Sequence, residues 1–294
     1  MSLREKIARG EFVVCAEMGP PQSCDADVIR KKAAYFKGVV DAVNITDNQT
    51  AIVRLSSIAA GKVLLEEGIE PIIQMTCRDR NRIAMQSDLL GAAALGIENV
   101  LCLTGDHQRF GDHPEARGVF DLDSIQFIAT LAQMNAGTLL SGGTLKKAPH
   151  FFIGAAANPC AEPVEMRLIR LEKKVRAGAA FIQTQPVFDL ERFSTWMEMV
   201  RERGLHEKTA ILAGILPVKS AKALEYMKAE VPGMRICSDF LTRMHNAAAP
   251  QEEGVRMAVE IIGALREMKG VAGIHIMPVM WESITPEIVR QAGL

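Results

Sequence analysis

Short apolar runs alternate with amphipathic segments along almost the whole chain of 294 residues. The runs are rich in Val, Ile, Leu and Ala and have the length of buried parallel strands. They cover residues 12–17, 41–46, 71–76, 98–104, 150–155, 179–185, 209–216 and 272–277. The segments between them place apolar residues at helical spacing among Lys, Arg and Glu. These segments cover residues 26–37, 50–67, 79–95, 123–135, 162–177, 189–203, 219–230 and 251–268.

The number of strand–helix units predicts the fold. Eight such units and a chain of this length are typical of one parallel β/α barrel. Asp79 is expected to cap a helix, and glycines are expected to end three others, namely Gly68, Gly96 and Gly178. We therefore predict an α/β fold, a single (β/α)8 TIM barrel over residues 1–294, with its active site at the C-terminal ends of the strands. Residues 278–294 form a tail whose amphipathic end packs on this barrel or on another subunit.

The overall charge argues against two classes of partner. The chain has 34 basic and 35 acidic residues and a formal net charge of -1, which offers no electrostatic footprint for nucleic acid or for an anionic membrane. Residues 1–9 lack the apolar core of a signal peptide, and no later run is long enough to span a bilayer. We therefore expect a cytoplasmic protein without a membrane span.

The residues that commonly bind metals are scattered. The six cysteines include no C-x-x-C pair, which argues against an iron–sulfur cluster within this chain. His107 and His113 have no third nitrogen or sulfur ligand nearby, so they are expected to be solvated. No metal site is predicted. The long irregular stretch 105–122, which contains both histidines, is nevertheless expected to be functional because loops of this length are uncommon without a role.

Two carboxylates, Glu17 and Asp106, are the strongest candidates for chemistry. Each follows an apolar run, so each is expected at the carboxyl end of a barrel strand, where β/α barrels hold their active sites. Glu17 also precedes the rigid turn of residues 18–21. This position suits a general acid. Asp106 lies in a Gly-Asp pair, which is also an ordinary turn sequence.

Other strand ends carry amides and hydroxyls rather than metal ligands. These polar positions are Thr46 with Asp47 and Asn48, Gln74 with Thr76, Thr104, Asn158, and Gln183 with Gln185. Such groups suit the edge of a planar heterocycle, such as a pteridine, a flavin or a purine. Thr46 and Thr76 can equally cap helices, and a single Gln at a strand end can equally bond backbone.

Four ordered motifs resemble the 5,10-methylenetetrahydrofolate reductase family of flavin-dependent β/α barrels. They are Glu17-Met-Gly-Pro-Pro, Leu103-Thr-Gly-Asp106, Thr184-Gln-Pro-Val-Phe-Asp189 and Gly214-Ile-Leu-Pro-Val218. The resemblance extends from about residue 11 to the end of the chain. It implies reduction of 5,10-methylenetetrahydrofolate to 5-methyltetrahydrofolate, or the reverse oxidation, with a flavin as hydride carrier.

The resemblance also assigns roles to individual residues. Glu17 and Asp106 are implied to be catalytic, with Glu17 as the general acid, and the folate is implied to contact Glu17, Gln185 and Leu216. The implied flavin contacts are Thr46, Gln74, Thr104, Gly105, Asp106, Asn158, Lys173 and Lys174. Without the resemblance, the two lysines would fit a solvated helix face equally well.

Departures from the family pattern concern the cofactor. Gln74 stands where familiar bacterial members have His, Thr104 where they have Arg, and residues 156–158 replace a segment with Tyr. These changes affect the part of the site that holds the adenosine half of FAD. FAD is the expected flavin, and FMN remains an alternative.

A further departure concerns the source of electrons. Ala221 stands where the family has a Phe that stacks on NADH or folate. We therefore expect electrons from a separate iron–sulfur subunit, as in the acetogen-type branch, with direct use of NAD(P)H as the alternative. This implies a homo- or hetero-oligomer. A flavin-free folate or corrinoid methyl-transfer barrel and a non-catalytic folate-binding subunit remain alternative functions.

Overall fold

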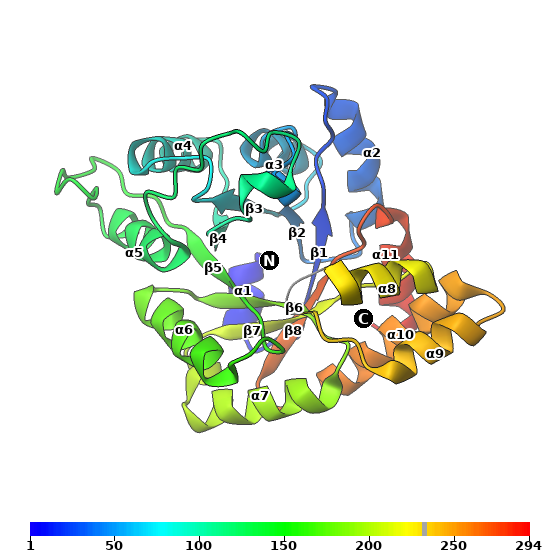
Figure 1. The fold of residues 1–294 in the computed structure, drawn as a ribbon. Coiled ribbons are helices and arrows are strands. Elements are labelled where there is room, and N and C mark those ends of the chain that lie inside the picture. Colours follow the sequence, from blue (N-terminus) through cyan, green and yellow to red (C-terminus); the bar gives the residue numbers. More distant parts are fainter. Residues whose placement is uncertain (231–233) are drawn as a thin grey trace.

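Eight parallel strands close into a barrel in chain order, and helices surround it (Figure 1). The computed structural model describes residues 1–230 and 234–294. The strands are β1 (Val13–Met18), β2 (Ala42–Ile45), β3 (Pro71–Thr76), β4 (Asn99–Leu103), β5 (Phe152–Ala157), β6 (Phe181–Pro186), β7 (Ala210–Ile215) and β8 (Val271–Ile276). β8 pairs with β1, which closes the sheet. The predicted (β/α)8 TIM barrel is therefore confirmed.

The helices follow the predicted alternation with some differences. They are α1 (Leu3–Ala8), α2 (Ala26–Phe36), α3 (Ser57–Glu66), α4 (Arg82–Ala94), α5 (Ser124–Asn135), α6 (Val164–Ala177), α7 (Leu190–Glu202), α8 (Ala221–Glu230), α9 (Ser238–Asn246), α10 (Pro250–Arg266) and α11 (Thr285–Gln291). Short 3-10 turns occur at Gln49–Ala51, Gln108–Phe110, Leu205–Glu207 and Glu282–Ile284. Glycines at 68, 96 and 178 follow α3, α4 and α6 with positive φ, as predicted.

Two predicted helix starts were wrong. The helix expected over 50–67 begins only at Ser57, because Thr50 and Ala51 have positive φ and Ser56 supplies the N-cap. Asp79 does not cap α4. Asn81 does so, through its side-chain oxygen, while the Asp79 carboxylate accepts hydrogen bonds from the Arg78 guanidinium. Asp79 therefore forms an ion pair with Arg78 instead of a helix cap.

Helices α1 and α9 were not predicted. α1 precedes β1 and buries Leu3 completely, and the Leu3 backbone N–H donates to the Glu70 carboxylate at 2.9 Å. α9 lies between α8 and α10 and buries Met244, while its Phe240 ring packs edge-on against Phe188. Both helices are short, so their sequence periodicity is weak.

The barrel interior is divided into an apolar lower part and a polar upper part. Alternate strand residues join Leu3 of α1 in one buried apolar cluster, which we call the lower interior: Val13, Cys15, Ala42, Ile72, Leu101, Phe152, Phe181, Ala210 and Leu212. Phe152 and Phe181 stack with centroids 5.1 Å apart. A Cβ on Gly154 would lie 2.2 Å from the Phe181 ring, so only glycine leaves room for this stack.

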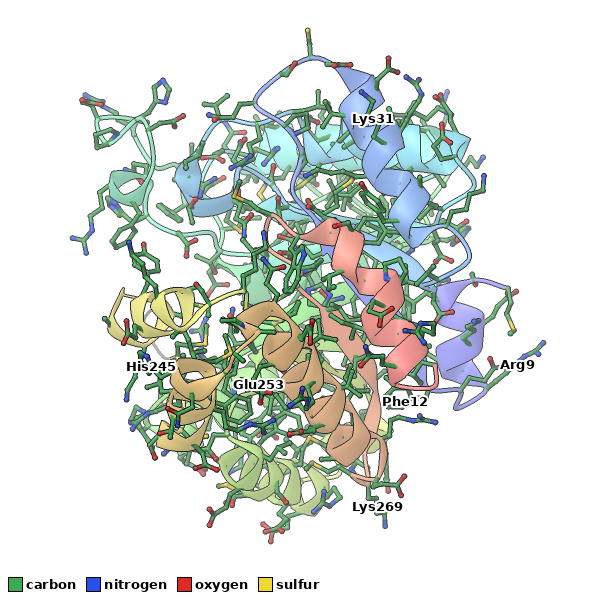
Figure 2. The ribbon with its side chains drawn as sticks, turned by 90° about the vertical axis from the view of Figure 1, so that its right-hand side faces the viewer. Arg9, Phe12, Lys31, His245, Glu253 and Lys269 are labelled. Carbon is green, nitrogen blue, oxygen red and sulfur yellow. The ribbon has the colours of Figure 1, made fainter. Side chains whose placement is uncertain are left out.

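The C-terminal tail packs on its own barrel. α11 lies against both α10 and α2 (Figure 2), and it buries Ile288 and Val289. Lys32 of α2 also donates to the Glu282 carboxylate at 2.5 Å. The alternative in which the tail packs on its own barrel is therefore confirmed. None of the helices in the described part of the chain combines the length and apolar character needed to cross a membrane.

Candidate functional site

A cavity of about 990 Å³ opens at the carboxyl ends of the strands. Most of the predicted site residues line it, namely Glu17, Thr46, Gln74, Thr104, Gly105, Asp106, Asn158, Gln185 and Leu216. They come from seven strands or the loops that follow them. Its volume is in the range of small-molecule and cofactor sites. Residues far apart in sequence thus meet because parallel strands end at the same rim. We call this space the main cavity.

Glu17 is held by hydrogen bonding on the wall of the main cavity. Its side chain is 14% exposed, and Gln74 Nε2 donates to Glu17 Oε2 at 2.9 Å. His275 Nε2 lies 3.6 Å from the same oxygen, and Asn44 Nδ2 lies 3.2 Å from His275 Nδ1. Asn44 and His275 are buried within the barrel. With Asn44 Nδ2 as donor to His275 Nδ1, the ring proton lies on Nε2, which faces the Glu17 carboxylate.

Residues just after β2 and β4 form one wall of the main cavity. Thr46 is 2% exposed, and its Oγ1 has no hydrogen-bond partner among the described residues. Gly105 has φ +90°, and a Cβ there would lie 3.0 Å from Thr76 Cβ. This glycine therefore lets the chain pass close to Thr76. Asn48 and Thr50, in the turn after β2, also line the cavity with positive φ, a strained conformation that is often found at functional sites.

An ion-pair network supports this side of the cavity. The buried Asp47 carboxylate accepts from Arg80 at 2.7 Å and from the Thr76 backbone at 2.9 Å. Arg78 is 2% exposed, and its guanidinium donates to Asp79 and to the backbone oxygens of Asn48 and Asp106. Arg78 therefore ties together the loops that follow β2, β3 and β4.

The remaining predicted residues occupy different parts of the rim. Asp106 and Gln185 are exposed and line the main cavity. Thr104 Oγ1 accepts from the Ser124 backbone at 3.2 Å, so it also fixes the start of α5. Leu216 contributes an apolar wall from the segment after β7. These positions provide acceptors and donors around an apolar space, as a planar heterocycle requires.

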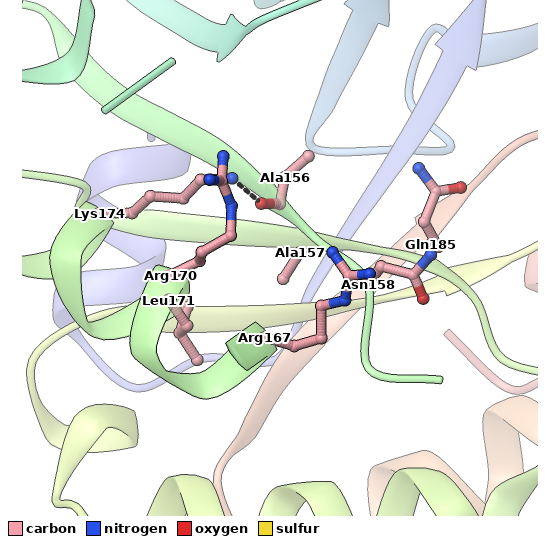
Figure 3. Close-up of a pocket in the computed structure, with 8 residues that line it drawn as sticks. All are labelled: Ala156, Ala157, Asn158, Arg167, Arg170, Leu171, Lys174 and Gln185. Carbon is pink, nitrogen blue, oxygen red and sulfur yellow. Dashed lines mark hydrogen bonds between the residues drawn. The ribbon is translucent and has the colours of Figure 1, made fainter. Parts of the chain in front are cut away.

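A smaller cavity of about 200 Å³ adjoins the main one (Figure 3). Asn158 and Gln185 line both. We call it the α6 cavity, because its other polar side chains, Arg167, Arg170 and Lys174, come from that helix. Lys174 donates to the Ala156 backbone oxygen at 2.6 Å. Burial, together with the neighbouring charge of Arg170, lowers the pKa of Lys174 to about 8.

The two predicted lysines lie on different sides of α6. Lys174 lines the α6 cavity, whereas Lys173 is exposed and lines neither cavity. Four further residues in or beside these cavities were not predicted, namely Arg78, His275, Arg167 and Arg170. Arg167, Arg170 and Lys174 follow an i, i+3, i+7 spacing that places them on one helix face, and this signal was present in the sequence. His275 has no comparable local signal, because its partners come from β1 and β2.

No group of three or more His, Cys, Asp and Glu side chains that could hold a metal ion occurs in residues 1–230 and 234–294. His113 pairs with Asp112 at 3.0 Å in the loop after β4. His107 caps the short turn Gln108–Phe110. Both histidines therefore have structural partners within their own loop.

Comparisons with known proteins identify a family. The family model for methylenetetrahydrofolate reductase matches residues 2–293. "5,10-methylenetetrahydrofolate reductase" of Salmonella typhimurium is 26% identical over 289 residues, covering 93% of this chain and 89% of that protein. "Probable methylenetetrahydrofolate reductase (NADPH)" of Caenorhabditis elegans is 26% identical over 255 residues, covering 84% of this chain and 36% of that protein. The chain thus spans well under half of the length of the latter.

Solved structures support the fold alone. A Clostridium thermocellum protein described as binding two copies of 5-methyl-5,6,7,8-tetrahydrofolic acid superposes with a TM-score of 0.68 at 17% identity, covering 99% of this chain and 97% of that chain. A 2,3-dimethylmalate lyase superposes with a TM-score of 0.53 at 11% identity, covering 100% of this chain and 86% of that chain. The same barrel thus carries different chemistries.

Proposed function

Because the chain belongs to the methylenetetrahydrofolate reductase family, we propose that it interconverts 5,10-methylenetetrahydrofolate and 5-methyltetrahydrofolate with a bound flavin. The observation that carries the proposal is the environment of Glu17. This carboxyl group lies on the wall of a cofactor-sized cavity, with Gln74 and His275 on its inner side. A general acid needs such a fixed position close to the reacting atoms.

The main cavity fits a flavin in its chemistry. Thr46 Oγ1, which has no hydrogen-bond partner among the described residues, lines one side of it with Gly105 and the amide of Asn158. These groups would hold the flavin on the side of β2, β4 and β5. Gln185 of β6 and Leu216, which follows β7, would hold the folate on the opposite side of the cavity. A reduced flavin supplies the hydride when it is bound.

The chain's own acid supplies the proton. Glu17 donates a proton to the ring nitrogen that departs when the five-membered imidazolidine ring of the folate opens. The opened ring leaves an iminium whose methylene carbon accepts the hydride and becomes the methyl group. Gln74 Nε2, which already donates to Glu17, stabilises the carboxylate that remains. Asp106 and Gln185 hold the pterin during this step.

Two features of α8 bear on the electron source. Ala221 offers no ring for stacking, and we propose that a separate iron–sulfur subunit supplies the electrons. Tyr226, on the same helix, does line the cavity and is 64% exposed. It is therefore the side chain through which a nicotinamide ring would stack if NAD(P)H reacted directly.

Anaerobic half-reactions test the proposal. The purified, flavin-loaded chain is mixed with NADH or with a chemical reductant, and flavin absorbance is followed before and after 5,10-methylenetetrahydrofolate is added. We expect the folate to reoxidise the reduced flavin and to yield 5-methyltetrahydrofolate. Reduced flavin that stays reduced after folate is added would reject the reductase function.

The same experiment tests the electron source. We expect the chemical reductant to bleach the flavin quickly and NADH to bleach it slowly. Fast bleaching by NADH that is lost in a Tyr226→Ala variant would instead establish direct use of the nicotinamide and remove the need for a partner.

A further inference from the structure

Glu17 is held by side chains that can act either as hydrogen-bond donors or as acceptors. Gln74 Nε2 donates to Glu17 Oε2 at 2.9 Å, and His275 Nε2 lies 3.6 Å from the same oxygen. An amide can turn round to present its oxygen, and a neutral imidazole has one donor and one acceptor nitrogen. Among the described residues, no Lys or Arg forms an ion pair with Glu17. These partners therefore fix the position of Glu17 without fixing its charge.

The nearby Asp47 carboxylate is held in a different manner. It accepts hydrogen bonds from the Arg80 guanidinium, and from Thr76 through both its backbone N–H and its hydroxyl. The guanidinium and the backbone N–H can only donate, so they suit a carboxylate and not a protonated acid. Glu17 has no such obligatory donor in the described part of the chain. Only Glu17 is thus supported in a way that suits both protonation states.

The contacts behind Glu17 come from three adjacent strands, β8, β1 and β2. Glu17 of β1 is the register partner of Asn44 on β2, and Cys15 of β1 is the register partner of His275 on β8. Asn44 Nδ2 lies 3.2 Å from His275 Nδ1. The 3.6 Å between His275 and Glu17 is longer than a hydrogen bond. Catalytic hydrogen bonds are often long without substrate and shorten in the complex, so these strands hold His275 within reach of Glu17.

Asn44 can serve both tautomers of His275. Asn44 is fully buried, and its Oδ1 has no hydrogen-bond partner in residues 1–230 and 234–294. A buried oxygen without a partner is costly, which indicates that it has one in another state of the site. When the Asn44 amide turns round, Oδ1 accepts a hydrogen bond from His275 Nδ1–H, and His275 Nε2 becomes an acceptor. One rotation of an amide therefore reverses the role of the nitrogen that faces Glu17.

The layer of side chains that contains Asn44 and His275 has a third polar member. Gln183 follows the inward-facing Phe181 by two residues and therefore also points into the barrel. It is 3% exposed, and neither polar atom of its side chain has a partner among the described residues. Asn44, Gln183 and His275 come from β2, β6 and β8, and alternate strands of such a barrel form one interior layer. This layer is polar but contains no Lys, Arg, Asp or Glu.

The ionisable groups that surround this layer are engaged elsewhere or neutral. Burial raises the pKa of the Cys15 thiol well above its ordinary value, so this group below Glu17 is uncharged. Asp47 pairs with Arg80, Arg78 pairs with Asp79, and Lys219 donates to the Met280 backbone oxygen. The charged side chains that line the main cavity besides Glu17 are Asp47, Arg78, Asp106, Lys219 and Lys222. None of these forms an ion pair with Glu17 or His275.

We propose that His275 and Asn44 are positioning residues that hold Glu17 in both of its protonation states, so that the acid regains its proton without moving. The inference rests on the proposed function for the role of Glu17 as the acid. When Glu17 is a carboxylate, Asn44 Nδ2 donates to His275 Nδ1, and His275 Nε2–H points at Glu17. When Glu17 is protonated, its O–H donates to His275 Nε2, and His275 Nδ1–H donates to Asn44 Oδ1.

The exchange between the two states balances. His275 carries one ring proton in each state, and Asn44 only rotates its amide. The net change is one proton, which Glu17 takes up from solvent through the main cavity and then passes to the departing ring nitrogen of the folate. The imidazole and the amide are unchanged after one turnover.

The tautomer of His275 tests the inference without any turnover. The flavin-loaded chain is labelled with isotopic nitrogen in its histidines, and the NMR signals that disappear in His275→Gln belong to His275. At mildly alkaline pH we expect the ring proton on Nε2. At a pH low enough to protonate Glu17 we expect it on Nδ1 alone, and Glu17→Gln should abolish this change. A tautomer that does not respond to the protonation of Glu17 would overturn the inference.

Reoxidation of the reduced flavin by 5,10-methylenetetrahydrofolate tests the effect on Glu17. His275→Leu removes both the donor and the acceptor, and we expect it to slow reoxidation about ten- to a hundredfold. Its rate should also persist to higher pH than in the wild type, because an apolar neighbour disfavours the carboxylate. His275→Gln keeps a group that can donate or accept, so we expect it to restore the wild-type pH profile.

The matched control is His206→Leu. His206 is also largely buried but lies in the turn Leu205–Glu207 before β7, at the opposite end of the strands from Glu17. We expect this variant to leave the rate and its pH profile unchanged. Flavin binding and the thermal unfolding midpoint are measured for every variant, so that general damage to the barrel is recognised.

Two kinetic results would overturn the inference. One is an equal loss of rate in His275→Leu and His275→Gln with the pH profile of the wild type, because His275 would then serve packing alone. The other is a wild-type rate and pH profile in His275→Leu. A wild-type chain whose reduced flavin is not reoxidised by the folate would instead reject the proposed function, and the tautomer measurement would still decide how Asn44 and His275 respond to Glu17.

Discussion

The lower and upper parts of the barrel interior are built from the same strands but differ in polarity. The lower part is packed with apolar side chains, and the upper part lines the main cavity. In β1, Val13 and Cys15 are buried in the apolar lower interior, and Glu17, two residues further on, reaches the main cavity. In β3, Ile72 and Gln74 repeat the change. Side chains two residues apart on a strand point to the same side. In β1 and β3, a shift of two residues along the strand thus leads from the apolar lower interior to the main cavity.

The pairing of charged side chains also differs between the bottom and the mouth of the barrel. Beneath the barrel, Lys6 of α1 pairs with Asp41, and Glu70 accepts from Asn99 and from the Leu3 backbone. At the mouth, the cations of the α6 cavity have no described carboxylate partner. The charges beneath the barrel are thus satisfied within the chain. The cations of the α6 cavity keep donors that a ligand could use.

Glu17→Gln is expected to have the largest effect on the upper part. The amide keeps the size and the polar contacts of the side chain but cannot donate a proton as an acid. We expect methylenetetrahydrofolate reduction to fall by about 10²- to 10⁴-fold, measured with a chemical donor so that the electron source does not limit the rate. The thermal unfolding midpoint is the control and should change little. Wild-type turnover would remove Glu17 from the role of acid.

Phe181→Ala tests the lower part. Phe181 is fully buried and stacks on Phe152, so its removal leaves a cavity and should lower the free energy of unfolding by about 3–5 kcal/mol. Urea denaturation measures the loss. The matched control is Phe110→Ala near the mouth, where Phe110 is 60% exposed, and a change within about 0.5 kcal/mol is expected. Similar losses for both variants would contradict the conclusion that the packing of Phe181 in the lower interior stabilises the barrel.

Gln74→Leu is expected to act on chemistry more than on stability. It removes the 2.9 Å hydrogen bond that Gln74 donates to Glu17. A hydrogen bond to a charged group contributes about 1.5–3 kcal/mol, so we expect turnover to fall about ten- to a hundredfold. Activity is compared with Gln74→Glu and with the wild type. If Gln74→Leu leaves activity intact, the bond to Glu17 has no part in catalysis.

The smallest expected effect is the pH dependence of flavin binding. The resemblance to the family implies that Lys174 contacts the flavin. Burial and the charge of Arg170 lower the pKa of Lys174 to about 8, so this side chain is charged below that pH and loses its charge above it. Cys102 and Asp123 shift this pKa in the opposite direction and to a smaller extent. The phosphate of FMN is already a dianion there, and arginines do not titrate.

FMN affinity should therefore fall above pH 8, by at most about tenfold per pH unit, while riboflavin affinity stays level. Fluorescence titrations between pH 7 and 10 measure both. In a Lys174→Gln variant, the affinities for FMN and riboflavin should depend on pH in the same way. A riboflavin curve parallel to that of FMN would show that another group is responsible.

Much of the fold could be predicted from local pattern. The eight strands and most of the helices follow from apolar runs and helical spacing, because each strand of a parallel barrel is buried on both faces. The start of α3 could not be predicted, since Thr50 and Ala51 have positive φ in a turn that contacts the distant turn Gln108–Phe110. α1 was missed because its one fully buried residue, Leu3, closes a barrel that exists only after folding.

The sequence by itself determined the barrel and the rim position of Glu17 and of most other candidate site residues, because strand order in a parallel barrel brings strand ends to one edge. Only the tertiary structure decided that Gln74 and His275 adjoin Glu17, that Lys174 faces a cavity while Lys173 faces outward, and which arginines accompany it. These relations depend on distances between side chains of different elements, and the spacing of residues along the sequence does not predict such distances.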